Sequence, residues 1–418
     1  MKKIILLLSI VFNLVSCKQN QKTNTGTKDV NHSIEQELTA KLDSIVSNGK
    51  IIGVGVTMVN QNRVLYSNGF GYADKEAQIP YTKNTIQHIA SVSKTLIGIA
   101  LFKAQEMGKL NIDDPIEKHL PFKVVNPSFP MESITIRHLA QHTSGINDTE
   151  QYMDNAWILK KGQDLTQIST EYPAQRLNPP EKEVPMDVYL KEYLMVGGNY
   201  YQADNFINFR PGQRYNYSNI GATLAALVLE KATGMSFSDF TKEHILIPLD
   251  MTSSGWFLEH VDKSKHSKLY RNDYSLLPLY GAITYPDGML ITSPSDMGKY
   301  LTELIKGYSG NGTLLSADSY ANYFKEQLKK EHFESRNADN PYNEDYSPAL
   351  FIGHSALGYI GHSGGDAGVG TWMFFNKEKK TGRFIVINTD TGNDNREKEL
   401  EYYSIWDTMD SYLEKLGK

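Results

Sequence analysis

The chain has 418 residues with 43 basic and 48 acidic side chains, which gives a formal net charge of −5 at pH 7. This balance provides no strongly basic surface, so we expect no nucleic-acid partner. A single cysteine, Cys17, excludes an intramolecular disulfide. The fold must therefore be held by a hydrophobic core, which a chain of this length can bury.

The N-terminus has the pattern of an export signal. Two lysines precede an apolar run over residues 4–12, which is too short to span a membrane, and Leu14-Val15-Ser16 leads into Cys17. A bacterial lipobox ends in the same way; an ordinary secretory signal is the alternative. We expect residues 1–16 to be a lipoprotein signal peptide and Cys17 to be lipidated. The protein would then be exported and anchored to a bacterial membrane, on its periplasmic or cell-surface side.

Residues 17–32 differ from the rest of the chain in composition. They are polar, almost free of apolar side chains and without periodicity, which is typical of a flexible tether. Everything after them, residues 33–418, is expected to form a single domain. No internal repeat divides it.

The domain begins with a predicted helix and a predicted hairpin. Ser33 and Gln36 form a capping-box pattern ahead of regularly spaced apolar residues, which predicts a helix from Ser33 to about Gly49. Two β-rich runs, residues 54–59 and 63–70, are joined by a short polar turn. They predict an antiparallel hairpin.

The next stretch contains a candidate nucleophile. Apolar spacing predicts a helix over about residues 91–107, with Ser91 in its first turn. Lys94, three residues on, shares the same helical face, so its amine can reach the Ser91 hydroxyl. A serine hydroxyl reacts only when a base takes its proton, and a lysine can do so if its pKa is lowered. The pattern alone is weak because Ser-x-x-Lys is common by chance.

The middle of the chain gives weaker signals. Residues 110–121 predict a short helix. His142 could be a catalytic imidazole, but we favour a structural role in which it bonds backbone near a helix end. Residues 147–208 are weakly periodic, which indicates an irregular wall or a mobile insertion. Three aromatic residues near the end of this segment could line a substrate cleft, although surface packing would also explain them: Tyr200, Tyr201 and Phe206.

Tyr217 and Asn219 form a second candidate pair. They are two residues apart in a loop that opens a helix, so a phenol and a carboxamide can point into one site. A tyrosine is ordinarily protonated at neutral pH, and it can act as a base only beside a cation such as Lys94.

The C-terminal part predicts sheet and helix. Residues 288–296 are a strand-like run into a helix capped by Ser293, with proline at the first helical position. Residues 329–346 are polar and predict a surface loop. A hairpin is expected within residues 370–388, followed by a closing amphipathic helix over residues 400–416.

Three short motifs occur in a specific order: Ser91-Val92-Ser93-Lys94, Tyr217-Ser218-Asn219 and His362-Ser363-Gly364. They resemble the active-site motifs of the penicillin-recognising serine hydrolases. The surrounding segments are most similar to the branch of class C β-lactamases, D-alanyl-D-alanine carboxypeptidases, D-aminopeptidases and family VIII esterases. Supporting matches lie at residues 69–73, 142–145 and 248–251, where Asp250 replaces the usual glycine.

The resemblance implies an α+β fold of the β-lactamase/transpeptidase type, an antiparallel sheet flanked by helices plus a helical region. Ser91 would form an acyl-enzyme, with Lys94 and Tyr217 relaying protons; which of the two is the base stays open. Asn219 would orient the substrate amide. Gly364 and Gly365 would border the substrate, with the backbone N–H groups of Ser91 and Gly365 as oxyanion hole. The resemblance implies no metal and no organic cofactor.

One departure bears on the substrate. Most β-lactamases have lysine where this chain has His362, and histidine there is similar to the carboxypeptidases and D-aminopeptidases of the family. We therefore expect a peptide, amide or ester substrate, with D-amino-acid peptidase or esterase activity favoured over potent β-lactamase activity. His362 would bind a substrate carboxylate as an imidazolium; the alternative is a neutral imidazole that only hydrogen-bonds Tyr217 or substrate.

Two other function classes remain open. The chain could be a catalytically silent sensing or binding lipoprotein that keeps the fold. It could also be a lipoprotein whose segment 147–208 docks a partner. The co-occurrence of Ser91, Lys94, Tyr217 and Asn219 favours the enzyme, since a structural role requires no such set of groups.

Overall fold

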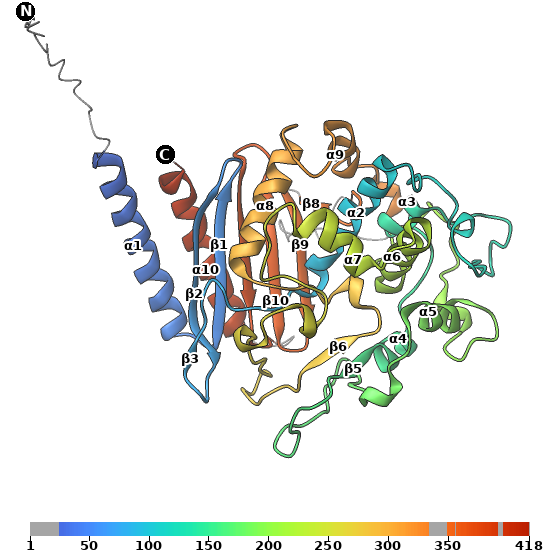
Figure 1. Cartoon of the computed structure of the whole chain (residues 1–418), viewed down its shortest axis with the longest axis horizontal. Helices are drawn as coiled ribbons and strands as arrows, with labels where there is room; N and C mark the ends of the chain where they lie inside the picture. The colour runs from blue at the N-terminus through green and yellow to red at the C-terminus, as the bar shows by residue number, and fades with distance from the viewer. Residues whose placement is uncertain (1–24, 334–348, 356, 392–395, 418) are drawn as a thin grey trace, which may run out of the picture.

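The computed structural model describes residues 25–333, 349–355, 357–391 and 396–417 (Figure 1). The predicted signal peptide and Cys17 lie outside the described residues, as does most of the predicted loop 329–346.

A seven-stranded antiparallel sheet forms the centre of the molecule. Its order is β3-β2-β1-β11-β10-β9-β8. β1 pairs with β2 on one side and with β11 on the other, so the two ends of the chain build one sheet. The predicted fold class and both predicted hairpins are confirmed. The strands are β1 (Gly53–Asn60), β2 (Val64–Asp74), β3 (Ile79–Pro80), β8 (Gly353–His354), β9 (Tyr359–Asp366), β10 (Val369–Asn376) and β11 (Thr381–Ile387).

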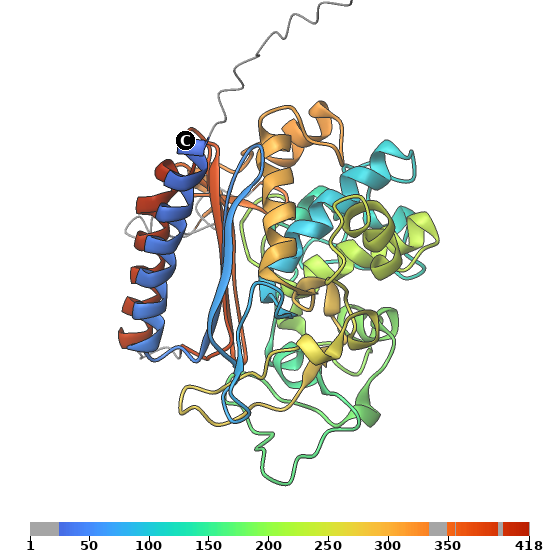
Figure 2. The same cartoon turned by 60° about the vertical axis from the view of Figure 1, so that its left-hand side comes forward.

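Two helices cover one face of the sheet. α1 (Thr25–Ser47) and α10 (Arg396–Leu416) lie side by side there (Figure 2) and share an apolar core with the sheet. The predicted closing helix is therefore present. α1 begins eight residues before the predicted start at Ser33, so residues 25–32, which were expected to be part of a flexible tether, are helical.

The other face of the sheet meets the helical region. α8 (Pro294–Tyr308) packs on β1 and β11, and its predicted cap is confirmed, because the Ser293 side chain accepts from the Asp296 N–H. α2 (Lys94–Glu106) and α6 (Asn219–Thr233) pack against each other in the main core. Both helices are apolar on nearly all sides, which is expected for helices enclosed by other elements.

Several shorter helices and strands complete the helical region. They are α3 (Ile136–Ala140), α4 (Glu150–Asn155), α5 (Met186–Leu194), α7 (Phe237–Thr241), α9 (Ala317–Tyr323), β4 (Gln87–His88), β5 (Trp157–Leu159), β6 (Tyr280–Ala282) and β7 (Ile291–Thr292). The predicted helix at 110–121 is wrong, since only the 3₁₀ turn Ile116–Lys118 forms there. Segment 147–208 is more regular than predicted, because it contains α4, β5 and α5.

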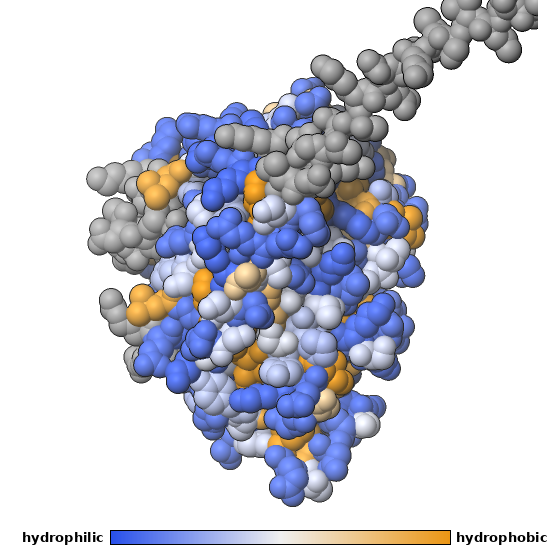
Figure 3. All heavy atoms as spheres, turned by 90° about the vertical axis from the view of Figure 1, so that its left-hand side faces the viewer, coloured by the Kyte–Doolittle hydropathy of each residue, from blue (hydrophilic) through white to orange (hydrophobic). Residues whose placement is uncertain are grey.

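The outer face seen in Figure 3 is mostly hydrophilic, with small separate apolar spots. Among the described residues, no single helix has the length and apolar composition needed to cross a membrane; one bent pair, Asn219–Thr233 with Phe237–Leu246, meets those two criteria only when taken together.

Candidate active site

The candidate nucleophile lies on a tight turn before α2. Ser91 belongs to the 3₁₀ turn η1 (Ala90–Ser93), so the predicted α-helix begins at Lys94 and not at Ser91. Ala90 has a φ of +46°, a backbone conformation that non-glycine residues adopt rarely and mostly where the surroundings enforce it. This turn leaves Ser91 partly exposed, while its neighbours Ala90 and Val92 are buried.

Lys94 is fully buried beside Ser91. Its Nζ donates to Ser91 Oγ at 2.9 Å and to the backbone carbonyl of Asp287 at 2.6 Å. The predicted proximity of the two side chains is therefore present in the structure. In general, burial and neighbouring oxygens can shift the pKa of an amine, and so change the pH at which it gains or loses its proton.

The second motif reaches the same place from α6. Lys94 Nζ lies 5.2 Å from the centroid of the Tyr217 ring. Asn219 is the first residue of α6, and Ser218 caps the helix by accepting from the Gly221 N–H at 2.9 Å. Tyr217 and Asn219 are thus held on either side of a helix cap.

His142 supports the second motif. Its ring stacks on Tyr217, with 4.4 Å between centroids, and its Nδ1 accepts from the Ser218 N–H at 3.1 Å. Burial lowers the pKa of His142 well below its ordinary value, with Lys94 and His362 adding to this, so the ring is neutral. The predicted structural role is confirmed, but the backbone that His142 holds belongs to Ser218 and not to its own helix.

Two acids, the partly buried Asp148 and the buried Asp287, complete the surroundings of Lys94, and sequence reasoning missed both. The Asp148 carboxylate accepts from Ser218 Oγ at 2.9 Å and from the N–H groups of Asn219 and Ile220 at 2.6 and 3.1 Å. Burial raises its pKa, although these three bonds oppose the change. Asp148 follows the His142 motif by a few residues. The only feature of the sequence that could have marked it as a site residue is an acid near the start of a helix.

Asp287 is the second missed acid. Its backbone carbonyl bonds Lys94, while its carboxylate accepts from Thr223 Oγ1 at 3.1 Å and from the Tyr152 hydroxyl at 3.3 Å. Burial raises the pKa of Asp287 to about 7, and Lys94 acts in the opposite direction. No pattern in the sequence connects residue 287 with residue 94.

The third motif lies on β9, which packs against η1. A Cβ added to Gly364 would be 2.7 Å from the Ser91 backbone nitrogen, so only glycine permits this approach. A Cβ on Gly365 would meet no atom within 4 Å. The strand therefore touches the nucleophile turn at Gly364 and is open at the next residue.

His362 is buried on the same strand. Its ring centroid is 6.2 Å from that of Tyr217, and Nδ1 donates to the carbonyl of Ser363, which can only accept. A neutral imidazole has one N–H, and this bond uses it. A second N–H for a substrate would therefore require the protonated ring.

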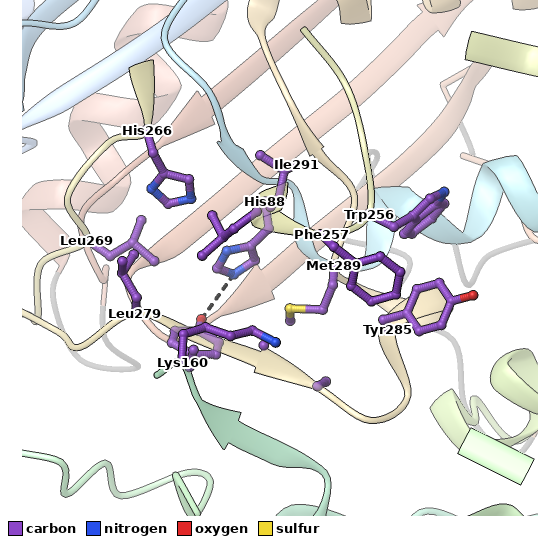
Figure 4. Close-up of a pocket in the computed structure, with 14 residues that line it drawn as sticks. His88, Lys160, Trp256, Phe257, His266, Leu269, Leu279, Tyr285, Met289 and Ile291 are labelled. Atoms are coloured by element: carbon purple, nitrogen blue, oxygen red, sulfur yellow. Dashed lines mark hydrogen bonds between the residues drawn. The ribbon is translucent and has the colours of Figure 1, made fainter. Parts of the chain in front are cut away.

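A buried polar cluster holds the end of β9 against the segment before Ser91. His88 Nε2 lies 3.0 Å from the Tyr280 hydroxyl and 3.6 Å from the Asp366 carboxylate. The Tyr280 hydroxyl also donates to the carbonyl of Ala367 at 2.7 Å. Figure 4 shows His88 among the side chains that line a small pocket, which include Lys160, His266 and Met289.

An open pocket of about 770 Å³ begins at Gly364 and Gly365. Its other walls come from loops around Tyr172, Asn272 and Asp390, so part of segment 147–208 does form a wall. The three aromatic residues predicted to line a cleft are not among its lining residues: Tyr200 packs on Tyr189, Phe206 is in the core, and Tyr201 packs against the core. Within the described ranges, no group of three or more His, Cys, Asp or Glu could hold a metal ion.

Comparison with known proteins decides the family. Residues 33–404 match the protein-family model described as Beta-lactamase. The chain belongs to this family. Members of this family and its structural neighbours are serine hydrolases.

Individual relatives are distant. The chain is 26% identical to Protein flp of Staphylococcus aureus (strain MRSA252) over 262 residues, which are 62% of this chain and 45% of that protein. It is 26% identical to Penicillin-binding protein 4* of Bacillus subtilis (strain 168) over 355 residues, 81% of this chain and 67% of that protein. The chain thus spans about half of the first relative.

Among solved structures, the D-amino acid amidase from Ochrobactrum anthropi SV3 complexed with L-phenylalanine amide is similar in fold. The TM-score is 0.63 over 90% of this chain and 99% of that chain, at 17% sequence identity.

Proposed function

We propose that this protein forms an acyl-enzyme on Ser91 and hydrolyses a peptide, amide or ester substrate at the cell envelope. The observation that carries the proposal is the 2.9 Å contact between Lys94 Nζ and Ser91 Oγ, made by a fully buried lysine. A silent binding protein with the same fold would not require an amine at the serine hydroxyl.

The reaction follows from the arrangement of groups. Ser91 Oγ attacks the substrate carbonyl carbon while its proton passes to Lys94 or Tyr217. The backbone N–H groups of Ser91 and Gly365 stabilise the oxyanion, which is typically worth about 3 kcal/mol per donor in such sites. The protonated base then gives its proton to the leaving group, and water hydrolyses the acyl-enzyme. Asn219 orients the substrate amide.

We place the substrate in the D-amino-acid peptide, amide or ester class, and we do not expect potent β-lactamase activity. The support is His362 on β9, where most β-lactamases of this type have lysine, together with the fold shared with a D-amino acid amidase. The pocket beside Gly365 offers room for such a substrate.

Export and lipid anchoring at Cys17 belong to the same proposal. They are supported by the lysines, apolar run and Leu14-Val15-Ser16 before that cysteine. Stable anchoring requires more than one acyl chain. Cys17→Ser should leave the membrane fraction and lack the lipid mass; a variant that remains in that fraction with the wild-type mass would contradict the anchor.

Acylation can be tested by intact-mass analysis with a fluorophosphonate and a fluorescent penicillin. We expect one adduct, mapped to Ser91 and abolished in Ser91→Ala. Ser93→Ala is the matched control, because Ser93 is buried and its Oγ accepts from the Leu290 N–H; it should still be labelled. An adduct on Ser93 or Ser363 would contradict the assignment.

Turnover separates the enzyme from a silent binder. Wild type should hydrolyse a p-nitrophenyl ester, a D-amino-acid amide or a D-Ala-D-Ala peptide faster than Ser91→Ala, with nitrocefin as the β-lactam reference. Stoichiometric labelling without turnover on any of these substrates would favour the sensing or binding alternative.

A further inference from the structure

The buried side of Lys94 carries an acid that none of the three motifs contains. Asp287 ends the 3₁₀ turn η8 (Tyr285–Asp287), which packs on η1, α2 and α6. It contacts Lys94 through its backbone carbonyl at 2.6 Å, and its own side chain is buried. One residue therefore both positions the amine through its backbone and carries a carboxyl group that interacts electrostatically with it.

The groups around this carboxyl come from several elements. Thr223 of α6 and Tyr152 of α4 donate to it, and both are uncharged, since burial raises the pKa of Tyr152 well above its ordinary value. Asp148, before α4, is a second acid acting on it. Lys94 of α2 is the cation that acts on Asp287 most strongly.

On its substrate side Lys94 is next to Tyr217, and the described rings that contact Tyr217 include His142 and His362. Tyr217 presents its ring to the amine, and His142, stacked behind that ring, is neutral. His362 lies next to Tyr217 and contributes positive charge or none. A buried ammonium is costly without a counter-charge, and an acid beside it reduces that cost.

We propose that Asp287 is a positioning residue for acylation, whose carboxylate is the counter-charge of Lys94 and sets the pH at which Ser91 becomes reactive. This inference rests on the proposed function. During attack the Ser91 proton passes to Lys94 or Tyr217, while Asp287 exchanges no proton with substrate. A nearby negative charge raises the pKa of either base. Removing the charge of Asp287 should therefore shift the pH dependence of Ser91 labelling in the same direction, whether Lys94 or Tyr217 is the base.

The experiment compares pH profiles of Ser91 labelling by the fluorophosphonate in wild type and Asp287→Asn. Asparagine keeps the size and an acceptor for Thr223 and Tyr152 but removes the charge. We expect the ascending limb to move to lower pH by about one unit, which makes labelling up to ~10-fold faster on the wild-type limb. Asp287→Glu retains the charge and should keep the wild-type limb.

Glu303→Gln is the matched control for loss of a buried carboxylate. Glu303 lies on α8 and is bonded by Tyr320 and Thr313, away from the described contacts of Lys94. It should leave the limb in place. An equal shift in this control, or an unmoved limb in Asp287→Asn with only a uniformly lower rate, would overturn the inference while leaving the proposed function intact. A wild type that is not labelled at Ser91 at any pH would overturn both.

Discussion

The sheet half of the molecule, which supplies β9 and the turn η1, can be compared with the helical half, which supplies Tyr217 and Asn219 at the start of α6. In the sheet half, the backbone of Gly364 lies against the backbone of Ser91, next to the apolar cores. In the helical half, the motif is fixed by desolvated polar groups, chiefly Asp148 and His142. The backbone contact at Gly364 is insensitive to pH, whereas the bonds of Asp148 and His142 depend on charge. Position of the nucleophile and control of its proton are thus assigned to different halves.

The largest effect on Ser91 labelling is expected from a substitution in the sheet half. Gly364→Ala places a Cβ 2.7 Å from the Ser91 nitrogen and must displace β9 from the turn. We expect Ser91 labelling to fall by at least ~100-fold, the typical consequence of losing one oxyanion donor. Gly365→Ala is the control, because its Cβ enters open space; it should fold normally and lose less. Wild-type labelling rates in Gly364→Ala would contradict the backbone contact.

The next largest effect is expected from a substitution in the helical half. Asp148→Asn replaces a carboxylate that accepts three hydrogen bonds, and an amide nitrogen cannot accept. We expect the free energy of unfolding to fall by about 2–4 kcal/mol, together with the labelling rate. Asp113→Asn, at an exposed ion pair with Arg137, should cost under about 1 kcal/mol. Equal denaturation midpoints for the two variants would show that Asp148 does not hold the motif.

His362 sharpens the comparison, since it is a titratable group of the sheet half that lies beside Tyr217. Because its Nδ1–H is bonded to Ser363, only the imidazolium offers another N–H to a substrate carboxylate. We expect kcat/KM for a D-Ala-D-Ala peptide to fall, by up to ~10-fold per pH unit, above the pKa of that ring, while an uncharged ester keeps its profile.

His362→Lys should move this decline upward in pH for the peptide only, because lysine stays charged throughout the neutral range. Identical profiles for peptide and ester, unaltered by the substitution, would favour the neutral imidazole and remove the case for a carboxylate-bearing substrate.

The smallest expected effect is on stability. Since the folded-state pKa of Asp287 is raised to about 7, the folded protein binds a proton that the unfolded chain releases between about pH 4 and 7. This group therefore makes the fold less stable as pH rises through that window. Asp287→Asn lacks this group, so its stability should fall less than that of wild type as pH rises through the same window. Denaturant titrations at several pH values measure the difference; a pH-independent difference would contradict the shift.

The same contrast explains which features the sequence could predict. The hairpins and the cap of α8 depend on neighbours in the chain, and the Ser91–Lys94 contact depends on spacing within one turn. The positions of Asp148 and Asp287 depend on the packing of distant segments, so no local pattern marks them. The helix predicted for residues 110–121 does not form, because Pro115 is extended, with ψ of 134°, and only one 3₁₀ turn follows. Residues 25–32 have no apolar periodicity from which the early start of α1 could be predicted.

The Ser91–Lys94 pair is tested most directly by the second-order rate constant of fluorophosphonate labelling in Lys94→Met. Methionine keeps an unbranched apolar stem in this buried position but provides no amine. If Lys94 activates or orients Ser91 Oγ, labelling at Ser91 should fall by about 10³-fold or more, in a protein with wild-type secondary structure. Labelling of Lys94→Met at the wild-type rate would contradict the central role of this pair.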